Sequence, residues 1–308
     1  MNESEYRDWQ LLCLYQGILA MNGELGVASN GARLVYRERS QEYFDKLRKK
    51  YSVVEIAGSG DTQTRAINLL KWVYENNYHK NAKLMDQECN ALNVFATTFG
   101  AGRDGGLNCA SLATALTDCL QATGIAARTI GCHSCNPYDF DMHVISIAYI
   151  PERAQWIMLD PSFNAYIMNE NCEVIAPWDF RHLLSTRAIV NCSPNTAYHN
   201  EDSVALETRK KEYFRYMAKN SGFYSEWSGS IFDYNYERQR TYLLPGNFDV
   251  INYWRNNVRY SMDWFGEDPV QIKNIFGAED YLLKWRDCLD IQTKVNCASF
   301  AEFTKAPV

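Results

Sequence analysis

The sequence predicts an α+β fold in which N-terminal helices pack on a small antiparallel sheet. Segments with helical periodicity fill the chain up to Gly124, and three short apolar runs follow them as strands. The second and third runs are separated by residues 151–154 alone, which is short enough for an antiparallel hairpin. Helices followed by neighbouring strands are the element order of α+β proteins. A chain of 308 residues is also long enough to bury a full-sized core.

The first four predicted helices are based on apolar spacing and caps. Residues 5–21 and 40–51 fit helices, the second with Ser40 as its N-cap. A stronger helix follows Asp61-Thr62. In it, apolar residues recur at three- and four-residue spacing, at Ala66, Ile67, Leu70, Val73 and Tyr74. Residues 91–96 are a further apolar segment that we interpret as helix.

A turn rich in glycine leads from these helices to Asn108-Cys109, with glycines at 100, 102, 105 and 106. Past the turn, the spacing of apolar residues predicts a helix that Gly124 ends; its stripe is Leu112, Ala113, Leu116, Cys119 and Leu120. Strands are predicted over residues 126–130, 143–150 and 155–160.

The predicted hairpin sets a condition on His143 and Asp160. A loop of even length centred on Glu152 and Arg153 places Asp160 opposite Ile145. Ile145 shares a face with His143, because side chains alternate along a strand. His143 and Asp160 then become diagonal neighbours within reach of each other. A loop of odd length would place them on opposite faces.

Residues 196–308 are predicted to be an aromatic-rich extension of a core formed by residues 1–195. The sequence leaves open whether this extension belongs to the same domain. Its periodicity is weak until Asn252, and helices are predicted over 252–264 and 278–288. We interpret its aromatic residues as packing, with a substrate groove lined by some Tyr and Trp side chains as the second interpretation.

Charge and composition argue against several classes of protein. A net charge of −6 and a pI near 5.5 argue against a nucleic-acid binder, and the basic clusters at 46–50 and 209–211 fit solvated helix faces. No apolar run reaches the length of about 18 residues that a membrane span requires. The ten cysteines lack a dense framework, and no export signal precedes them. We therefore expect mostly free, buried thiols in a cytoplasmic protein.

Cys109, His143 and Asp160 carry the strongest chemical signal. A cysteine is a good nucleophile as a thiolate, which a helix N-terminus and a neighbouring imidazolium both favour. Cys109 opens the predicted helix directly after the glycine-rich turn, where backbone amides can approach a developing oxyanion. We predict the Cys109 amide as one oxyanion donor, and the sequence does not identify the second. Neither a cofactor nor a metal ion is predicted at this site.

Four segments around these residues share a spaced pattern with a known family. They are residues 105–109 running into an apolar helix, 123–128 at its exit, 141–144 opening a strand, and 156–161. Together with an upstream helix over residues 65–74, they resemble the transglutaminase-like superfamily, the papain-related group that uses Cys, His and Asp in this order. The resemblance covers roughly residues 60–165.

This resemblance implies a papain-like, transglutaminase-like core and a cysteine enzyme. Its thiolate would attack an amide or related acyl group to give a thioester. His143 would protonate the leaving amine and then activate the acceptor, and Asp160 would fix the imidazole tautomer. Water as acceptor gives proteolysis or deamidation, and an amine gives transamidation. The implied substrate is a peptide, a protein or an amide-containing small molecule; the oligomeric state is left open.

The chain departs from the family pattern in three places. Two residues, where the family has one, separate Gly106 from Cys109. Ala126 stands where a proline is usual, and Ile145 where an aromatic residue is common. The alternative is therefore a catalytically inactive transglutaminase-like binding or scaffold protein. It predicts that the three side chains lie too far apart for a relay.

Purely structural interpretations also exist for single residues. Cys109 could be a buried small hydrophobe like Cys119. His143 could be a structural histidine, and Asp160 could start a turn before Pro161. The sequence Cys132-His133-Ser134-Cys135 has metal-like spacing, but one such pair is weak support for zinc or for a redox site. We expect this stretch to form a loop at the rim of the cleft.

Overall fold

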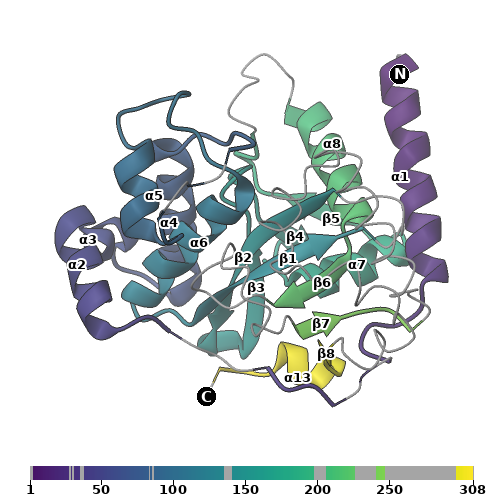
Figure 1. Cartoon of the computed structure of the whole chain (residues 1–308). Coiled ribbons are helices and arrows are strands. Elements are labelled where there is room, and N and C mark those ends of the chain that lie inside the picture. The colour runs from purple at the N-terminus through teal and green to yellow at the C-terminus, as the bar shows by residue number, and fades with distance from the viewer. Residues whose placement is uncertain are drawn as a thin grey trace, which may run out of the picture.

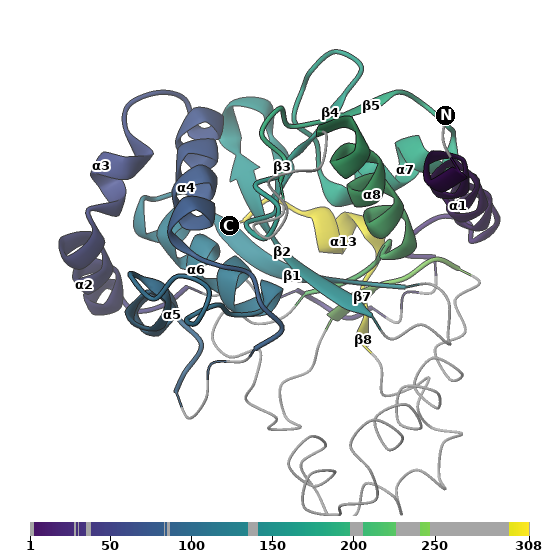
Figure 2. The same ribbon diagram turned by 90° about the horizontal axis from the view of Figure 1, so that it is seen from above.

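A central mixed sheet with helices on both faces forms the molecule. The computed structural model describes residues 3–27, 29, 31–34, 38–82, 84, 87–134, 141–197, 206–225, 241–246 and 296–307. In both views, helices α2 to α6 lie on one side of the sheet and α1, α7 and α8 on the other (Figures 1 and 2). The predicted α+β class is correct, and the helices of the N-terminal part do pack on a small sheet whose pairs are antiparallel except for the last.

The helices and strands have the following bounds. The helices are α1 (Glu3–Met21), α2 (Gln41–Tyr51), α3 (Val53–Ala57), α4 (Thr62–Asn76), α5 (Ala91–Thr98), α6 (Cys109–Ala122), α7 (Pro177–Ser185), α8 (Leu206–Lys219) and α13 (Phe300–Thr304), with the 3-10 turn η1 (Pro151–Arg153). The strands are β1 (Ala127–His133), β2 (Met142–Ile150), β3 (Gln155–Leu159), β4 (Ile167–Asn169), β5 (Val190–Cys192), β6 (Gly222–Ser225), β7 (Thr241–Leu243) and β8 (Asn296–Cys297).

The larger sheet has the strand order β3-β2-β1-β6-β7-β8, and β4 and β5 form a separate two-stranded sheet. Its first three strands are consecutive in the sequence and antiparallel. Strand β6 continues the sheet from β1, so residues from both predicted parts of the chain share it. The pair β7 and β8 is parallel. The division into a core over residues 1–195 and an extension remains a prediction.

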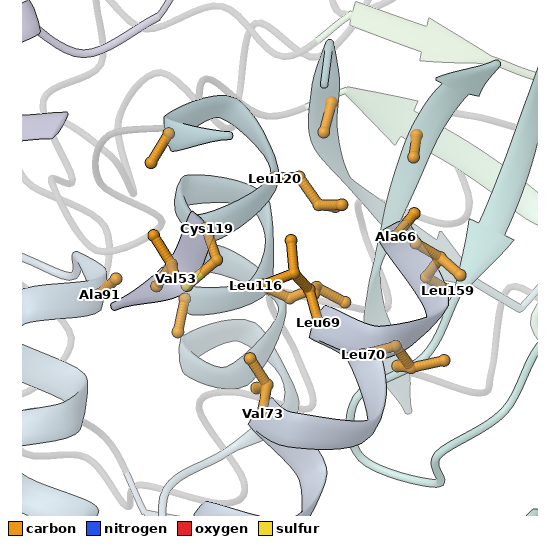
Figure 3. Close-up of a cluster of buried hydrophobic side chains, with 14 of the residues drawn as sticks. Val53, Ala66, Leu69, Leu70, Val73, Ala91, Leu116, Cys119, Leu120 and Leu159 are labelled. Carbon is orange, nitrogen blue, oxygen red and sulfur yellow. The ribbon is translucent and has the colours of Figure 1, made fainter. Parts of the chain in front are cut away.

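The two faces of the sheet bury two separate apolar clusters. Helices α2 to α6 pack on the face that presents Ala148 and Ile157. Figure 3 shows the centre of this cluster, where Leu116 and Leu120 of α6 meet Leu69 of α4. The opposite face carries its own cluster, which includes Ile145, Ile147, Trp156 and Met158 of the sheet and Tyr213 and Met217 of α8. Both faces are thus covered, and β1 is buried at every position.

Most predicted elements are confirmed with small shifts at their ends. Ser40 caps α2 and Asp61 caps α4, each accepting a hydrogen bond from the amide three residues later. Helix α6 begins at Cys109 and ends before Gly124, whose φ of +79° is the left-handed conformation of a glycine stop. The predicted helix over 91–96 is α5, which continues to Thr98.

One prediction fails in the described residues. Strand β1 continues from Ile130 to His133, so Cys132 and His133 lie in a strand and do not form the expected loop. Helix α8 lies where the weak periodicity gave no bounds for a helix, and it contains the basic cluster at 209–211 that we interpreted as a solvated helix face. The predicted helices over 252–264 and 278–288 lie outside the described residues, as does Cys135.

The cysteines follow the expectation of free thiols where the structure describes them. Free thiols are found at Cys13, Cys89, Cys109, Cys119, Cys132, Cys172 and Cys192, of which four are buried, one is exposed and two are intermediate.

Among the described helices, none combines the length and the hydropathy needed to cross a bilayer.

Candidate active site

Cys109 lies at the N-terminus of the central helix α6. Asn108 is the N-cap, and its Oδ1 accepts hydrogen bonds of 3.0 Å from both the amide and the hydroxyl of Ser111. The amide of Asn108 itself donates to the carbonyl of Ala82 at 2.8 Å. Within the described residues, no backbone group accepts a hydrogen bond from the Cys109 amide. Because amides in the first helical turn have no partner inside the helix, this amide is available to an anion.

His143 and Asp160 meet as the hairpin register requires. The β2–β3 register pairs Ile150 with Gln155 and Ser146 with Leu159, so the predicted loop of even length is confirmed. The turn is η1 followed by Ala154, whose φ of +49° is left-handed. If the register is continued by one residue pair, Asp160 lies opposite Ile145. Ile145 shares a face of β2 with His143, because side chains alternate along a strand. Nε2 of His143 lies 2.7 Å from Oδ2 of Asp160, and the side chains are 2% and 0% exposed.

Asp160 is held by more than the imidazole. Its Oδ1 accepts from the amide of Ser162 at 2.9 Å, and its Oδ2 also accepts from the Tyr213 hydroxyl at 3.0 Å. Its backbone forms an antiparallel bridge with Ala165. A buried carboxylate needs such donors to remain charged. The carboxylate therefore has a fixed position and a fixed set of partners before any substrate binds.

Helix α6 is tied directly to strand β2, which sets Cys109 relative to His143. The Ser146 hydroxyl donates to the carbonyl of Ala113 at 2.8 Å and accepts from the Thr117 hydroxyl at 3.0 Å. Ser146 follows His143 closely on the same strand, and Ala113 lies one helical turn after Cys109. These fully buried contacts fix the nucleophile and the imidazole to one frame.

The side chains of Cys109 and His143 are hydrogen-bonded, and they shift each other's pKa. Burial alone would raise the pKa of Cys109, but hydrogen bonds and charge from two histidines, His143 and His79, lower it to about 6. Burial would lower the pKa of His143, but the charge and hydrogen bond of Asp160, and then Cys109, raise it to about 10. The two shifts have opposite directions, and together they favour a thiolate–imidazolium pair at neutral pH.

Aromatic side chains enclose the imidazole. The His143 ring packs edge-on against Tyr216 of α8 at 5.3 Å and against Phe163 at 5.8 Å between centroids. Phe163 in turn contacts Tyr213 at 5.0 Å. Lys219 lies 5.3 Å from the centre of the Tyr216 ring and pairs with Asp141 at 2.6 Å. Helix α8 thus covers the His143–Asp160 pair with two tyrosines one turn apart.

Three of these residues were not predicted from the sequence. Tyr213 and Tyr216 belong to the aromatic region that we interpreted as packing, and Tyr213 does more than pack because its hydroxyl bonds to Asp160. His79 hydrogen-bonds to Cys109 although it lies in the loop after α4, where no periodicity draws attention to it. The sequence offers one hint at His79: histidine is scarce in this chain, which has five in all.

Cys132 lies directly opposite His143 in the β1–β2 register. It is fully buried, and burial together with the charges of Asp160 and Cys109 raises the pKa of its thiol well above the ordinary value. It is therefore a neutral thiol beside the site. In the part of the chain that the structure describes, no group of three or more His, Cys, Asp or Glu side chains is arranged to hold a metal ion.

One segment of this chain matches the model of a known protein family. Residues 50–161 match the family model of the transglutaminase-like superfamily. This segment runs from the end of α2 to just past Asp160 and contains Cys109, His143 and Asp160. The resemblance expected over residues 60–165 is therefore confirmed, with an earlier start.

Solved structures with detectable similarity are distant. A candidate cysteine protease from Cytophaga hutchinsonii is 20% identical, with a TM-score of 0.32 over 50% of this chain and 48% of that one. A candidate protease from Parabacteroides distasonis is 15% identical, with a TM-score of 0.25 over 38% of this chain and 25% of that one. LapG of Legionella pneumophila is 12% identical, with a TM-score of 0.31 over 60% of this chain and 100% of that one.

The chain therefore spans less than half the length of the first two of these structures. No curated protein matches it. Structural similarity at such low TM-scores carries no information on activity, so the function of this protein has to be inferred from its own side chains.

Proposed function

We propose that this protein is a cysteine-dependent enzyme that transfers or hydrolyses an acyl group from an amide through a thioester at Cys109. One observation carries the proposal. The side chain of Cys109 is hydrogen-bonded to His143, whose Nε2 lies 2.7 Å from a buried carboxylate of Asp160. A nucleophile, a base and an orienting group in that chain of contacts are the parts of a thiol acyl-transfer site.

The protons can be followed through the reaction. The Cys109 sulfur adds to the carbonyl carbon, and the carbonyl π pair moves to oxygen. On collapse the C–N bond breaks, and the amine leaves with the proton of the His143 imidazolium, giving a thioester and a neutral imidazole. The imidazole then takes a proton from the acceptor as the acceptor attacks the thioester, and the C–S bond breaks, which returns the Cys109 thiolate and the His143 imidazolium. Asp160 keeps the ring oriented throughout by its contact with Nε2.

The same arrangement supports an active enzyme over a scaffold that has lost its chemistry. A scaffold is under no requirement to keep the three side chains in contact, yet here they are in contact and the pKa of Cys109 is lowered to about 6. The substrate is a peptide, a protein or an amide-containing small molecule. The acceptor is water or an amine, and a cytoplasmic location stays a prediction from the sequence.

The proposal is tested by the reactivity of Cys109. Iodoacetamide at pH 6, followed by peptide mass spectrometry, should label Cys109 faster than the remaining cysteines. Cys172 is the internal control for access, because its side chain is exposed. Equal labelling of Cys109 and Cys172 would count against an activated thiolate.

The substrate and the acceptor are tested on the acyl-enzyme. Wild-type protein and Cys109→Ala are incubated in a cell lysate, and any group attached to Cys109 is identified by mass spectrometry. Addition of a primary amine then reports the acceptor, because a transferase forms the amide and a hydrolase releases the acid. Turnover of a confirmed substrate by Cys109→Ala at the wild-type rate would contradict the proposal.

A further inference from the structure

A second imidazole reaches the nucleophile from a different part of the fold. His79 hydrogen-bonds to the side chain of Cys109, as His143 does. His143 comes from the beginning of β2, whereas His79 lies in the loop between α4 and α5. The proton transfers proposed above use His143 and leave His79 without a role. The backbone around His79 is nevertheless held by several contacts.

The loop that carries His79 is bonded to the residues just before Cys109. The amide of Leu107 donates to the carbonyl of Tyr78 at 2.9 Å, and the amide of Lys80 donates to the carbonyl of Leu107 at 2.9 Å. His79 and Leu107 thereby form a parallel bridge. Because Leu107 is two residues before Cys109, this bridge places His79 beside the N-terminus of α6.

Close packing against the glycine-rich turn holds the same loop. A Cβ at Gly106 would lie 2.8 Å from Cβ of Lys80 and 3.1 Å from the carbonyl oxygen of Tyr78, so only glycine allows this approach. The guanidinium of Arg103 lies 5.4 Å from the centre of the Tyr78 ring. The loop is therefore held on both sides of His79.

The start of the loop is also fixed. Asn77 is buried at the end of α4, where its Nδ2 donates to the carbonyl of Val73 at 2.6 Å. Its Oδ1 accepts from the hydroxyl of Thr98 at 2.5 Å. His79 thus lies between Asn77, whose side chain is hydrogen-bonded, and Lys80, whose amide is hydrogen-bonded to Leu107. A side chain held this way is preorganised for a role at the sulfur.

The position suits a donor to the oxyanion. When the sulfur adds to a carbonyl carbon, the oxygen that gains charge is two bonds from the sulfur. A ring N–H that hydrogen-bonds to the sulfur in the free enzyme lies near that oxygen, and oxyanion donors act at roughly 2.7–3.1 Å. The Cys109 amide lies at the same helix N-terminus, so the two donors come from neighbouring segments.

We propose that His79 is the second oxyanion donor of this site, acting beside the Cys109 amide. The inference rests on the proposed function. As the C–S bond forms and the carbonyl π pair moves to oxygen, the His79 N–H donates a hydrogen bond to that oxygen and keeps its proton. When the electron pair returns from oxygen to re-form the carbonyl and the C–N bond breaks, His143 donates the proton to the amine. His79 still holds its own proton at the end.

A comparison of two reactions of the same thiolate tests this role. Alkylation by iodoacetamide forms no oxyanion, whereas acylation by p-nitrophenyl acetate does. Both rates are measured for the full-length protein at pH 9, above the lowered pKa of Cys109, in wild type, His79→Gln and His79→Met. Glutamine and methionine have similar length, but only glutamine keeps an N–H donor.

In His79→Met, acylation should fall by about 10²- to 10³-fold, the range for loss of one oxyanion donor, while alkylation changes by less than about threefold. His79→Gln should recover much of the acylation rate. If both reactions fall by the same factor, or if acylation is equal in the Gln and Met variants, the donor role is wrong. Circular dichroism of each variant identifies a loss of folding, and in that case the Gln variant with near-wild-type acylation still supports the role.

Failure of the proposed function would look different. Wild-type protein would then show neither rapid alkylation of Cys109 nor a burst of p-nitrophenolate, whatever residue stands at position 79. A wild-type burst that survives unchanged in His79→Met overturns the role of His79 alone.

Discussion

The hydroxyl of Tyr213 donates to the same oxygen of Asp160 that binds His143. The distances to Oδ2 are 3.0 Å from Tyr213 and 2.7 Å from Nε2 of His143. Tyr213 is 1% exposed, and burial followed by the charge of Asp160 raises the pKa of its hydroxyl well above the ordinary value. It is therefore a neutral donor that stabilises the carboxylate without competing for the imidazole proton.

Replacing Tyr213 by Phe should destabilise the fold by about 1–3 kcal/mol, because a buried carboxylate loses one of its donors. The ring, which packs on Phe163 at 5.0 Å, is retained. Urea unfolding followed by circular dichroism measures the loss. Tyr216→Phe is the matched control one turn along α8, since its ring stays against His143 and it should unfold within about 0.5 kcal/mol of wild type. Equal losses in the two variants would contradict a special role for the Tyr213 hydroxyl.

The rate of Cys109 alkylation should rise with pH through about 6, because the thiolate forms above the lowered pKa. In Asp160→Asn the imidazolium loses its main stabilising charge, so the pKa of His143 falls and the thiolate loses its cationic partner. The rise should then move to higher pH, toward the ordinary thiol pKa of about 8.5. Because the two groups titrate as a coupled pair, the complete profile is fitted, not a single rate.

Asp141→Asn is the control for that experiment. It removes one negative charge near the site, but Asp141 is half-exposed and pairs with Lys219. Its alkylation profile should still rise near pH 6. If the profile shifts as far as that of Asp160→Asn, the general negative charge near the site, and not the Asp160 contact, determines the pKa of Cys109.

Gly106→Ala should cost about 1–3 kcal/mol of stability, because the added methyl forces the Tyr78–Lys80 loop away from the turn. Acylation by p-nitrophenyl acetate should fall at the same time, since the displaced loop carries His79. Gly17→Ala in α1 is the control: a Cβ there meets nothing within 4 Å, and alanine favours a helix. If Gly106→Ala has the same stability to unfolding and the same acylation rate as wild type, the tight packing at Gly106 is contradicted.

Arg39→Met should destabilise the protein by about 3–5 kcal/mol, because it leaves a buried carboxylate without its cation. Asp118 of α6 is 0% exposed and accepts from Nε of Arg39 at 2.8 Å and from the hydroxyl of Tyr43 at 2.6 Å. Lys46→Met, in an exposed pair with Glu42, is the control and should unfold at nearly the wild-type urea midpoint. Similar midpoints for the two variants would show that the Arg39 pair does not hold α2 and α6 together.

The sequence was sufficient where local rules decide the structure. The cap at Asn108, the glycine stop at Gly124 and the short turn between β2 and β3 each act over a few residues. The hairpin register follows from the turn length and the alternation of side chains, so the sequence stated the condition under which His143 meets Asp160, and the structure has the even loop that fulfils it.

The failures share a cause in long-range packing. Strand β1 was ended too early because Gly131 reads as a break and because a strand buried on both faces shows no alternation. In α8, Tyr213, Phe214 and Tyr216 put aromatic side chains around much of the helix, which hides the stripe that contains Tyr213 and Met217. His79 reaches Cys109 through a bridge to Leu107, and nothing local to residue 79 records that approach.

The position of Tyr213 has a consequence for dividing this protein. The transglutaminase-like match ends at residue 161, whereas Tyr213 and Tyr216 come from α8 well beyond it. A fragment cut to the matched segment would keep nucleophile, base and carboxylate but expose the His143–Asp160 pair to water on the side that α8 now covers. The pKa of His143 would then lie closer to its ordinary value, because water would screen the charge of Asp160. Grafting this chemistry onto another scaffold would therefore require the helix that shields it as well as the three residues that perform it.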